Sequence, residues 1–224
     1  KLANAGLAIE KLNQLKTLEP SNTAIDKKLA EIYYLKNDFS KAADAYSRFA
    51  MGPKANEEDL VRYAFALFLN HDFAKSLEVA NMGLKKNPRH AAFNRLAMYN
   101  NTDLKRFEEA LKAADVFFNE CDKADYSYLD YMYYGHLLEE LKKYDEAVGQ
   151  YEKAVELDPT KTDLYKNISS VYEQKNDYKK AIGAYHKYYS SLEKEKQTPD
   201  LQFQLGRLYY GAGTQPDSLT INVE

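Results

Sequence analysis

An internal repeat of about 34 residues is the feature of this chain that most constrains its fold. The segment Lys36–Phe39, with the sequence Lys-Asn-Asp-Phe, returns as Lys-Asn-Asp-Tyr at Lys175–Tyr178. An aromatic residue recurs with spacings of 34, 34, 37 and 34 residues, at Phe39, Phe73, Phe107, Tyr144 and Tyr178. Three residues after each aromatic stands a small residue: Ala42, Ser76, Ala110, Ala147 and Ala181. A period of this length indicates stacked copies of one structural unit.

A second column of small residues lies about twelve positions before the first column, at Ala30, Ala64, Ala97, Gly135, Ser169 and Gly206. We expect both columns to be buried, because small side chains let two helix backbones approach closely and a leucine there would overpack by about 1–3 kcal/mol. The third copy fits this column only if one extra residue lies between its two helices, within residues 100–106.

Each period contains two segments of about fourteen residues whose apolar residues recur at helical spacing. In the first copy these are Leu29, Ile32 and Tyr33, followed by Phe39, Ala42, Tyr46 and Phe49. The Asn-Asp or His-Asp pairs between the segments are typical of a helix end followed by an N-cap. Pro20, Pro88 and Pro159 then open the next copy. Each copy is therefore predicted to be a helical hairpin, and the chain to be all-α.

The order of these residues resembles the tetratricopeptide repeat family. The match is best in residues 128–161, where the marked positions are Tyr131, Tyr134, Gly135, Leu138, Tyr144, Ala147, Tyr151, Ala154 and Pro159. The resemblance implies a right-handed superhelical solenoid of antiparallel helix pairs. In such a stack the first helices line an inner, concave wall and the second helices form the outer one.

The repeat pattern predicts seven segments. They are 1–22, the second helix of a truncated repeat; 23–56 and 57–90, full repeats; 91–127, a repeat with an insertion; 128–161, a full repeat; 162–198, a repeat with a longer second helix; and 199–224, a first helix ended by Gly211–Pro216, plus a tail. We expect the chain to be a piece of a longer one, with uncapped ends that favour self-association.

Composition and motifs argue against several classes of function. The 31 basic and 34 acidic residues are interleaved and give a net charge of −3, so no nucleic-acid partner is expected. No uncharged apolar stretch is long enough for membrane insertion by this segment. With one cysteine, four scattered histidines and no phosphate-binding loop, the sequence predicts no catalytic residues, no metal and no cofactor. Abundant Tyr, Lys and Asn are compatible with a bacterial source. The single cysteine does not choose between compartments, so periplasm, cell envelope and cytoplasm stay open.

By the resemblance, the second, fifth, ninth, twelfth and thirteenth residues of each repeat face the groove. In the first three copies the predicted groove residues are Lys27, Glu31, Tyr34, Val61, Phe65, Phe68, Asn94 and Met98. In the later copies they are Met132, His136, Glu139, Lys166, Ser170, Glu173, Phe203, Arg207 and Tyr210. The first set is largely apolar, although Phe65 and Phe68 could instead pack across a tight superhelix. The second set is mixed, and its Lys166 and Arg207 could orient an acidic group. Some tetratricopeptide repeats grip a terminal carboxylate with a Lys-Asn, Asn, Lys-Arg set on three successive first helices. The corresponding positions of the first three copies do not carry that set: they are Lys27 and Glu31, Val61 and Phe65, and Asn94 and Met98.

The leading hypothesis is a non-enzymatic scaffold that binds a peptide segment of a partner protein in the concave groove. A first alternative is a structural spacer or self-assembly segment of a larger protein, possibly of the cell envelope. A second alternative is an accessory to an enzyme encoded elsewhere in a longer chain.

Overall fold

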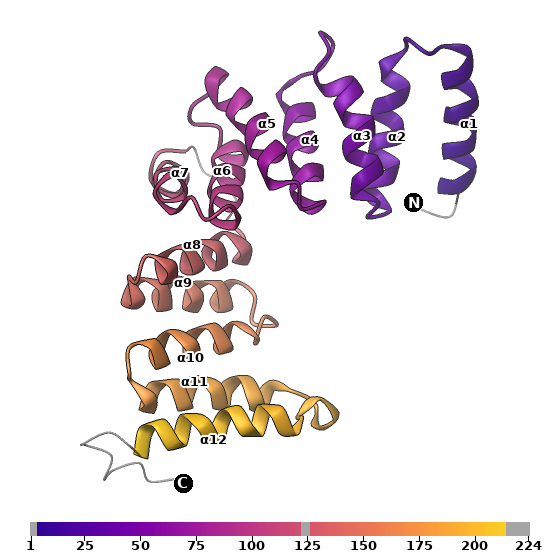
Figure 1. Cartoon of the computed structure of the whole chain (residues 1–224). Coiled ribbons are helices and arrows are strands. Elements are labelled where there is room, and N and C mark those ends of the chain that lie inside the picture. Colours follow the sequence, from indigo (N-terminus) through magenta and orange to yellow (C-terminus); the bar gives the residue numbers. More distant parts are fainter. Residues whose placement is uncertain (1–3, 122–125, 214–224) are drawn as a thin grey trace. The chain divides into compact units, whose positions relative to one another are not determined.

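The computed structural model of the chain describes residues 4–121 and 126–213. These residues form twelve α-helices and one short 3₁₀ helix, with no β-strand among them. The helices divide into two compact units, one of α1–α7 and one of α8–α12 (Figure 1). The prediction of an all-α fold built from helix pairs is confirmed.

The first unit contains α1 (Ala5–Leu18), α2 (Thr23–Leu35), α3 (Phe39–Ala50), α4 (Glu57–Leu69), α5 (Phe73–Lys86), α6 (Ala91–Asp103) and α7 (Phe107–Asn119). Three pairs, α2 with α3, α4 with α5 and α6 with α7, pack side by side, and α3 contacts α4 as α5 contacts α6. Between the pairs lies a continuous core that includes Leu29, Tyr46, Leu67 and Phe93.

The second unit contains α8 (Tyr128–Glu140), α9 (Tyr144–Leu157), α10 (Leu164–Gln174), α11 (Tyr178–Ser191), the 3₁₀ helix η1 (Lys194–Lys196) and α12 (Pro199–Gly213). Helix α8 pairs with α9 and α10 with α11, while α12 packs on α11. Helix α11 has 14 residues, the same as α9, so the predicted longer second helix of this repeat is not present. The extra residues instead pass through η1 before α12 begins.

The turn inside each helix pair repeats with the period of the sequence. Each of the five turns has one residue with positive φ, between 57° and 60°. These residues are Asn37, His71, Lys105, Lys142 and Asn176. In three of the five turns the next residue is an aspartate that caps the second helix, and its carboxylate accepts a hydrogen bond from the amide of Lys41, Lys75 or Lys180. The cap satisfies an amide that has no partner within the helix, so the predicted Asn-Asp and His-Asp signals mark real helix boundaries.

The inserted residues of the third repeat lie after its second helix, not between its helices as predicted. Helices α6 and α7 begin at the same interval as α4 and α5, whereas the connection from Asn119 to Tyr128 is longer than that from Lys86 to Ala91. The residue equivalent to Ala64 is therefore Met98 rather than Ala97. Met98 thus places a large side chain at a position where the other repeats have a small residue.

The column of small residues is buried at Ala30, Ala64, Gly135 and Ser169, as predicted. At Gly135 a β-carbon would lie 2.8 Å from the ring of Tyr151 in α9. Gly206 differs, because it is exposed and a β-carbon there would meet nothing within 4 Å. No helix follows α12 in the described part of the chain, so this face of α12 has no second helix against it.

The predicted helix end at Gly211–Pro216 is wrong in its first half, since α12 continues through Gly213. Residues 214–216 lie outside the described residues. A β-carbon on Gly211 would lie 2.4 Å from the ring of Tyr178. This glycine does not end the helix. It allows α12 to approach α11 closely, because it has no β-carbon.

Candidate functional site

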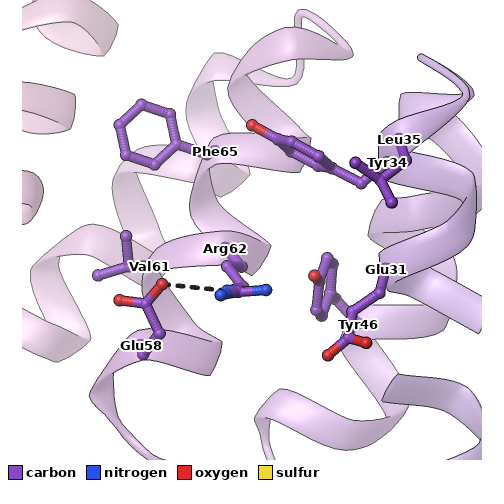
Figure 2. A pocket seen from close by; sticks show the side chains of 8 residues that line it. All are labelled: Glu31, Tyr34, Leu35, Tyr46, Glu58, Val61, Arg62 and Phe65. Atoms are coloured by element: carbon purple, nitrogen blue, oxygen red, sulfur yellow. Dashed lines mark hydrogen bonds and ion pairs between the residues drawn. The ribbon is translucent and has the colours of Figure 1, made fainter. Parts of the chain in front are cut away.

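The first unit has a cavity of about 480 Å³ between helices α2 and α4. Leu35 and the ring of Tyr34 lie on the α2 side, and Val61 and Phe65 lie on the α4 side (Figure 2). Tyr46 of α3 also lines the space. Concave, mostly apolar sites with a few polar groups are typical ligand-binding sites in proteins.

The polar groups of this α2–α4 pocket are Glu31, Glu58 and Arg62, together with two phenols. Arg62 Nε donates to Glu58 Oε1 at 3.0 Å, and in Figure 2 its guanidinium reaches toward Tyr46 and Glu31. Burial raises the pKa of Tyr46, and a hydrogen bond with Arg62 partly opposes that rise. The pKa of Tyr34 is also raised by burial, so both phenols stay protonated at neutral pH.

Four of the predicted groove residues, Glu31, Tyr34, Val61 and Phe65, line this pocket together. Lys27 does not, because its ammonium pairs with Asp59 at 2.6 Å and lies over the ring of Phe49 at 5.0 Å. Phe68 is half-buried and packs against Phe73 and Tyr99, with ring centroids 5.7 and 5.5 Å away. Phe68 therefore packs between repeats, as the alternative proposed, whereas Phe65 faces the pocket.

Four lining residues were not among the predicted ones: Leu35, Tyr46, Glu58 and Arg62. The repeat pattern carried a signal for two of them, because Leu35 is the thirteenth residue of its repeat and Glu58 the second. Tyr46 belongs to a second helix, and only the packing of α3 behind α2 and α4 brings it to the cavity.

Asn94 and Met98 are not groove residues. Met98 is fully buried, and the Asn94 amide donates to the carbonyls of Pro88 and His90. The misplaced extra residue in the third repeat caused this error, because a shift of one residue turns a helix position by about 100°. The residue equivalent to Val61 is Arg95, and the residue equivalent to Phe65 is Tyr99. The guanidinium of Arg95 lies over the ring of Phe117 at 5.1 Å.

The second unit has a separate cavity of about 350 Å³ among α10, α11 and α12. Its lining includes the predicted residues Lys166, Ser170, Glu173 and Arg207, and also Tyr185. Arg207 donates two hydrogen bonds to Glu173, at 2.5 and 2.9 Å. The cavity is thus mixed in character, and its arginine already holds a carboxylate.

The remaining predicted residues of the second unit do not line this cavity. Phe203 and Tyr210 are 70% and 76% exposed on α12. His136 lies on α8 beside Glu140, with Nε2 at 3.5 Å from Oε1, and Glu139 accepts from Tyr151 and Gln174. Met132 packs against the core of α8–α10.

The described residues form neither a metal site nor a membrane span. No group of three or more His, Cys, Asp and Glu side chains there is placed to hold a metal ion. No helix of this part of the chain has the length and apolar character to cross a bilayer.

Comparison with known proteins identifies the repeat. Residues 128–161 match the family model described as tetratricopeptide repeat. None of the curated proteins compared with the chain matches it. A tetratricopeptide repeat protein from Parabacteroides merdae is similar over 93% of this chain and 82% of its own, with 18% identity and a TM-score of 0.69. MamA from Desulfovibrio magneticus is similar over 79% of this chain and 97% of its own, with 18% identity and a TM-score of 0.66.

A third similar structure is the C-terminal part of a repeat-containing protein from Cytophaga hutchinsonii. It is 26% identical over 67% of this chain and 57% of its own, with a TM-score of 0.59. At such identities the likeness concerns the fold. Residues 128–161 are therefore a tetratricopeptide repeat, and the chain has the all-helical fold of tetratricopeptide-repeat proteins.

Proposed function

We propose that this protein is a non-enzymatic scaffold that binds a peptide segment of a partner protein, with one apolar side chain of that segment in the α2–α4 pocket. The fold suggests a protein–protein interaction scaffold, and proteins built of these repeats are generally not catalysts. The observation that carries the proposal is the pocket itself, in which Tyr34, Val61 and Phe65 surround space large enough for a bulky side chain.

The energetics favour an extended or helical segment over a small molecule. Burying one apolar side chain contributes about 1.5–3 kcal/mol, which alone corresponds to very weak binding. Glu31, Glu58 and Arg62 stand around the apolar walls and can bond to main-chain or side-chain groups of the segment. A peptide that continues beyond the pocket adds the further contacts that useful affinity requires.

Phe65→Ala is expected to weaken peptide binding by about tenfold or more, because it removes one apolar wall of the pocket. Peptides selected from a random phage-displayed library on the immobilised protein provide the probe, and fluorescence polarisation gives the affinity. Phe203→Ala is the matched control, since this phenylalanine is exposed on α12 and outside the pocket. Equal affinities for the wild type and Phe65→Ala, with helicity retained, would rule out the pocket as the binding site.

Self-assembly is a second candidate function, because apolar side chains are exposed on the two terminal helices. Leu7 and Leu18 of α1 are 57% and 80% exposed, and Phe203 and Tyr210 of α12 are exposed to a similar degree. Faces of this kind favour association. Light scattering distinguishes the two functions: a concentration-dependent oligomer that persists in Phe65→Ala and disappears in Leu18→Glu supports self-assembly.

A further inference from the structure

The cavity among α10, α11 and α12 contains Arg207, which is hydrogen-bonded to two neighbouring side chains. Arg207 gives two hydrogen bonds to the carboxylate of Glu173 and one, from Nε at 3.1 Å, to Oε1 of Gln204. A bidentate arginine–carboxylate pair combines two charge-assisted hydrogen bonds, which are stronger and more specific in geometry than hydrogen bonds between neutral groups. Glu173 therefore sits where a carboxylate from another molecule could sit.

The preceding repeat shows what the same glutamate does when no arginine faces it. Glu139 and Tyr151 occupy the same positions in their repeat as Glu173 and Tyr185 do in theirs. In the earlier repeat the Tyr151 hydroxyl donates to Glu139 Oε2 at 2.9 Å. The equivalent bond from Tyr185 to Glu173 is not formed, because Glu173 is turned toward Arg207 of α12.

As a result the hydroxyl of Tyr185 is buried without a hydrogen-bond partner among the described residues. The side chain is only 6% exposed and lines the cavity. Burial raises the pKa of Tyr185, Tyr188 adds to the rise, and the charge of Arg207 opposes it, which places the phenol within reach of that charge. A buried donor without an acceptor is unfavourable, so the free protein holds a donor that a carboxylate could satisfy.

The cavity offers more than one contact to a ligand. Lys166 has no carboxylate partner within the described part of the chain, and its ammonium lies over the ring of Tyr188 at 5.3 Å. Leu201 and Leu208 add apolar surface next to the two cations. The combination fits an acidic side chain with an apolar neighbour.

We infer that the α10–α12 cavity binds a glutamate or aspartate side chain of a partner protein through Arg207 and Lys166, and that Glu173 is the internal ligand that this side chain displaces onto Tyr185. The exchange keeps the arginine–carboxylate pair and adds one hydrogen bond, from the Tyr185 hydroxyl to the displaced Glu173. The site is independent of the α2–α4 pocket, which lies in the other compact unit.

Titration with a short peptide tests this site directly. The probe is acetyl-Leu-Glu-Leu-amide, and its counterparts are acetyl-Leu-Gln-Leu-amide, without charge, and acetyl-Leu-Gln-Leu with a free carboxyl end. Binding is followed by the NMR signals of the Arg207 side chain and of the α10–α12 amides. We expect the glutamate peptide to bind more tightly than both counterparts. Equal binding of the neutral peptide, or of the free carboxyl end, overturns the inference.

Variants then distinguish the removal of Glu173 as an internal ligand from a general change in charge. Arg207→Gln is expected to weaken binding of the glutamate peptide by about tenfold or more. Glu173→Gln removes the internal ligand and is expected to strengthen binding by roughly three- to tenfold. Asp145→Asn, which removes a carboxylate paired with Lys175 outside the cavity, changes the net charge equally and is expected to leave the affinity unchanged. An equal gain in Asp145→Asn and Glu173→Gln contradicts the exchange.

Two tyrosine variants give a readout that a simple charge effect would not move. Tyr185→Phe should raise the thermal stability of the free protein slightly, since it removes a buried hydroxyl that has no acceptor there, and weaken peptide binding by roughly threefold or more. Tyr151→Phe should lower the thermal stability of the free protein and leave peptide binding unchanged, because the bond from Tyr151 to Glu139 exists in the free protein. Unchanged affinity in Tyr185→Phe refutes the movement of Glu173. Phe65→Ala should not alter this titration, so failure here and failure of the α2–α4 pocket are distinguishable.

Discussion

Phe93→Ala is expected to lower the free energy of unfolding of the first unit by about 3–5 kcal/mol. The Phe93 ring is fully buried, and it occupies the space directly above Gly83 of α5, where a β-carbon would lie 2.1 Å from it. Removing the ring therefore leaves a cavity between α5 and α6 that neither helix backbone can fill. Chemical denaturation gives the loss, and hydrogen exchange of the α5 and α6 amides shows that it is local.

Two further variants test whether this packing is the cause. Gly83→Ala should also destabilise the unit, since the added methyl group meets a ring that has no room to move. The double variant Gly83→Ala/Phe93→Leu should lose less stability than the sum of the losses in Gly83→Ala and in Phe93→Leu. The reason is that leucine is smaller than phenylalanine and makes room for the methyl group. Strict additivity would show that the two residues do not share this contact.

Tyr151→Ala is expected to cost about 3–5 kcal/mol in the second unit. Its ring is completely buried against Gly135 of α8, and its hydroxyl bonds to Glu139. Tyr151→Phe keeps the ring and should cost only about 0.5–1.5 kcal/mol, which isolates the hydroxyl. Equal losses for the two substitutions would mean that the hydrogen bond, not the ring, stabilises this helix pair.

A pair of glycines in the same repeat position supplies the control for this prediction. Gly135→Ala gains about 1 kcal/mol of helix propensity, but its methyl group must push the buried Tyr151 ring, so the net effect should be destabilising. Gly206→Ala adds its methyl group in open space and should stabilise α12 by roughly 0.5–1 kcal/mol. The same sign for both variants would contradict the packing described for Gly135.

Most of the fold was predictable because each repeat carries its own local signals. An aspartate after a residue that tolerates positive φ marks the start of a second helix, as at Asp38, Asp72 and Asp177. These signals act within a few residues, so they can be read without knowledge of the partner helix. The third repeat lacks such an aspartate, since Arg106 precedes α7, and there the alignment slipped by one residue.

The candidate site was predictable only in part. The resemblance to tetratricopeptide repeats identified Glu31, Tyr34, Val61 and Phe65, because it implies which side of each first helix faces the groove, and helical periodicity fixes the residues on that side. It did not identify Tyr46, which reaches the pocket from a second helix. It also included Lys27, whose ammonium is drawn away by the buried carboxylate of Asp59.

The amino-acid sequence by itself determined the helix pairs, their turns and the small residues between them, because these depend on the chemistry of neighbouring residues and on a regular period. Tertiary structure alone decided which side chains bond to which. Glu139 and Glu173 hold the same position in successive repeats, yet one accepts from Tyr151 and the other pairs with Arg207. The difference arises because α12 packs on α11 and brings a guanidinium beside Glu173, a contact between residues 34 positions apart that no local pattern records.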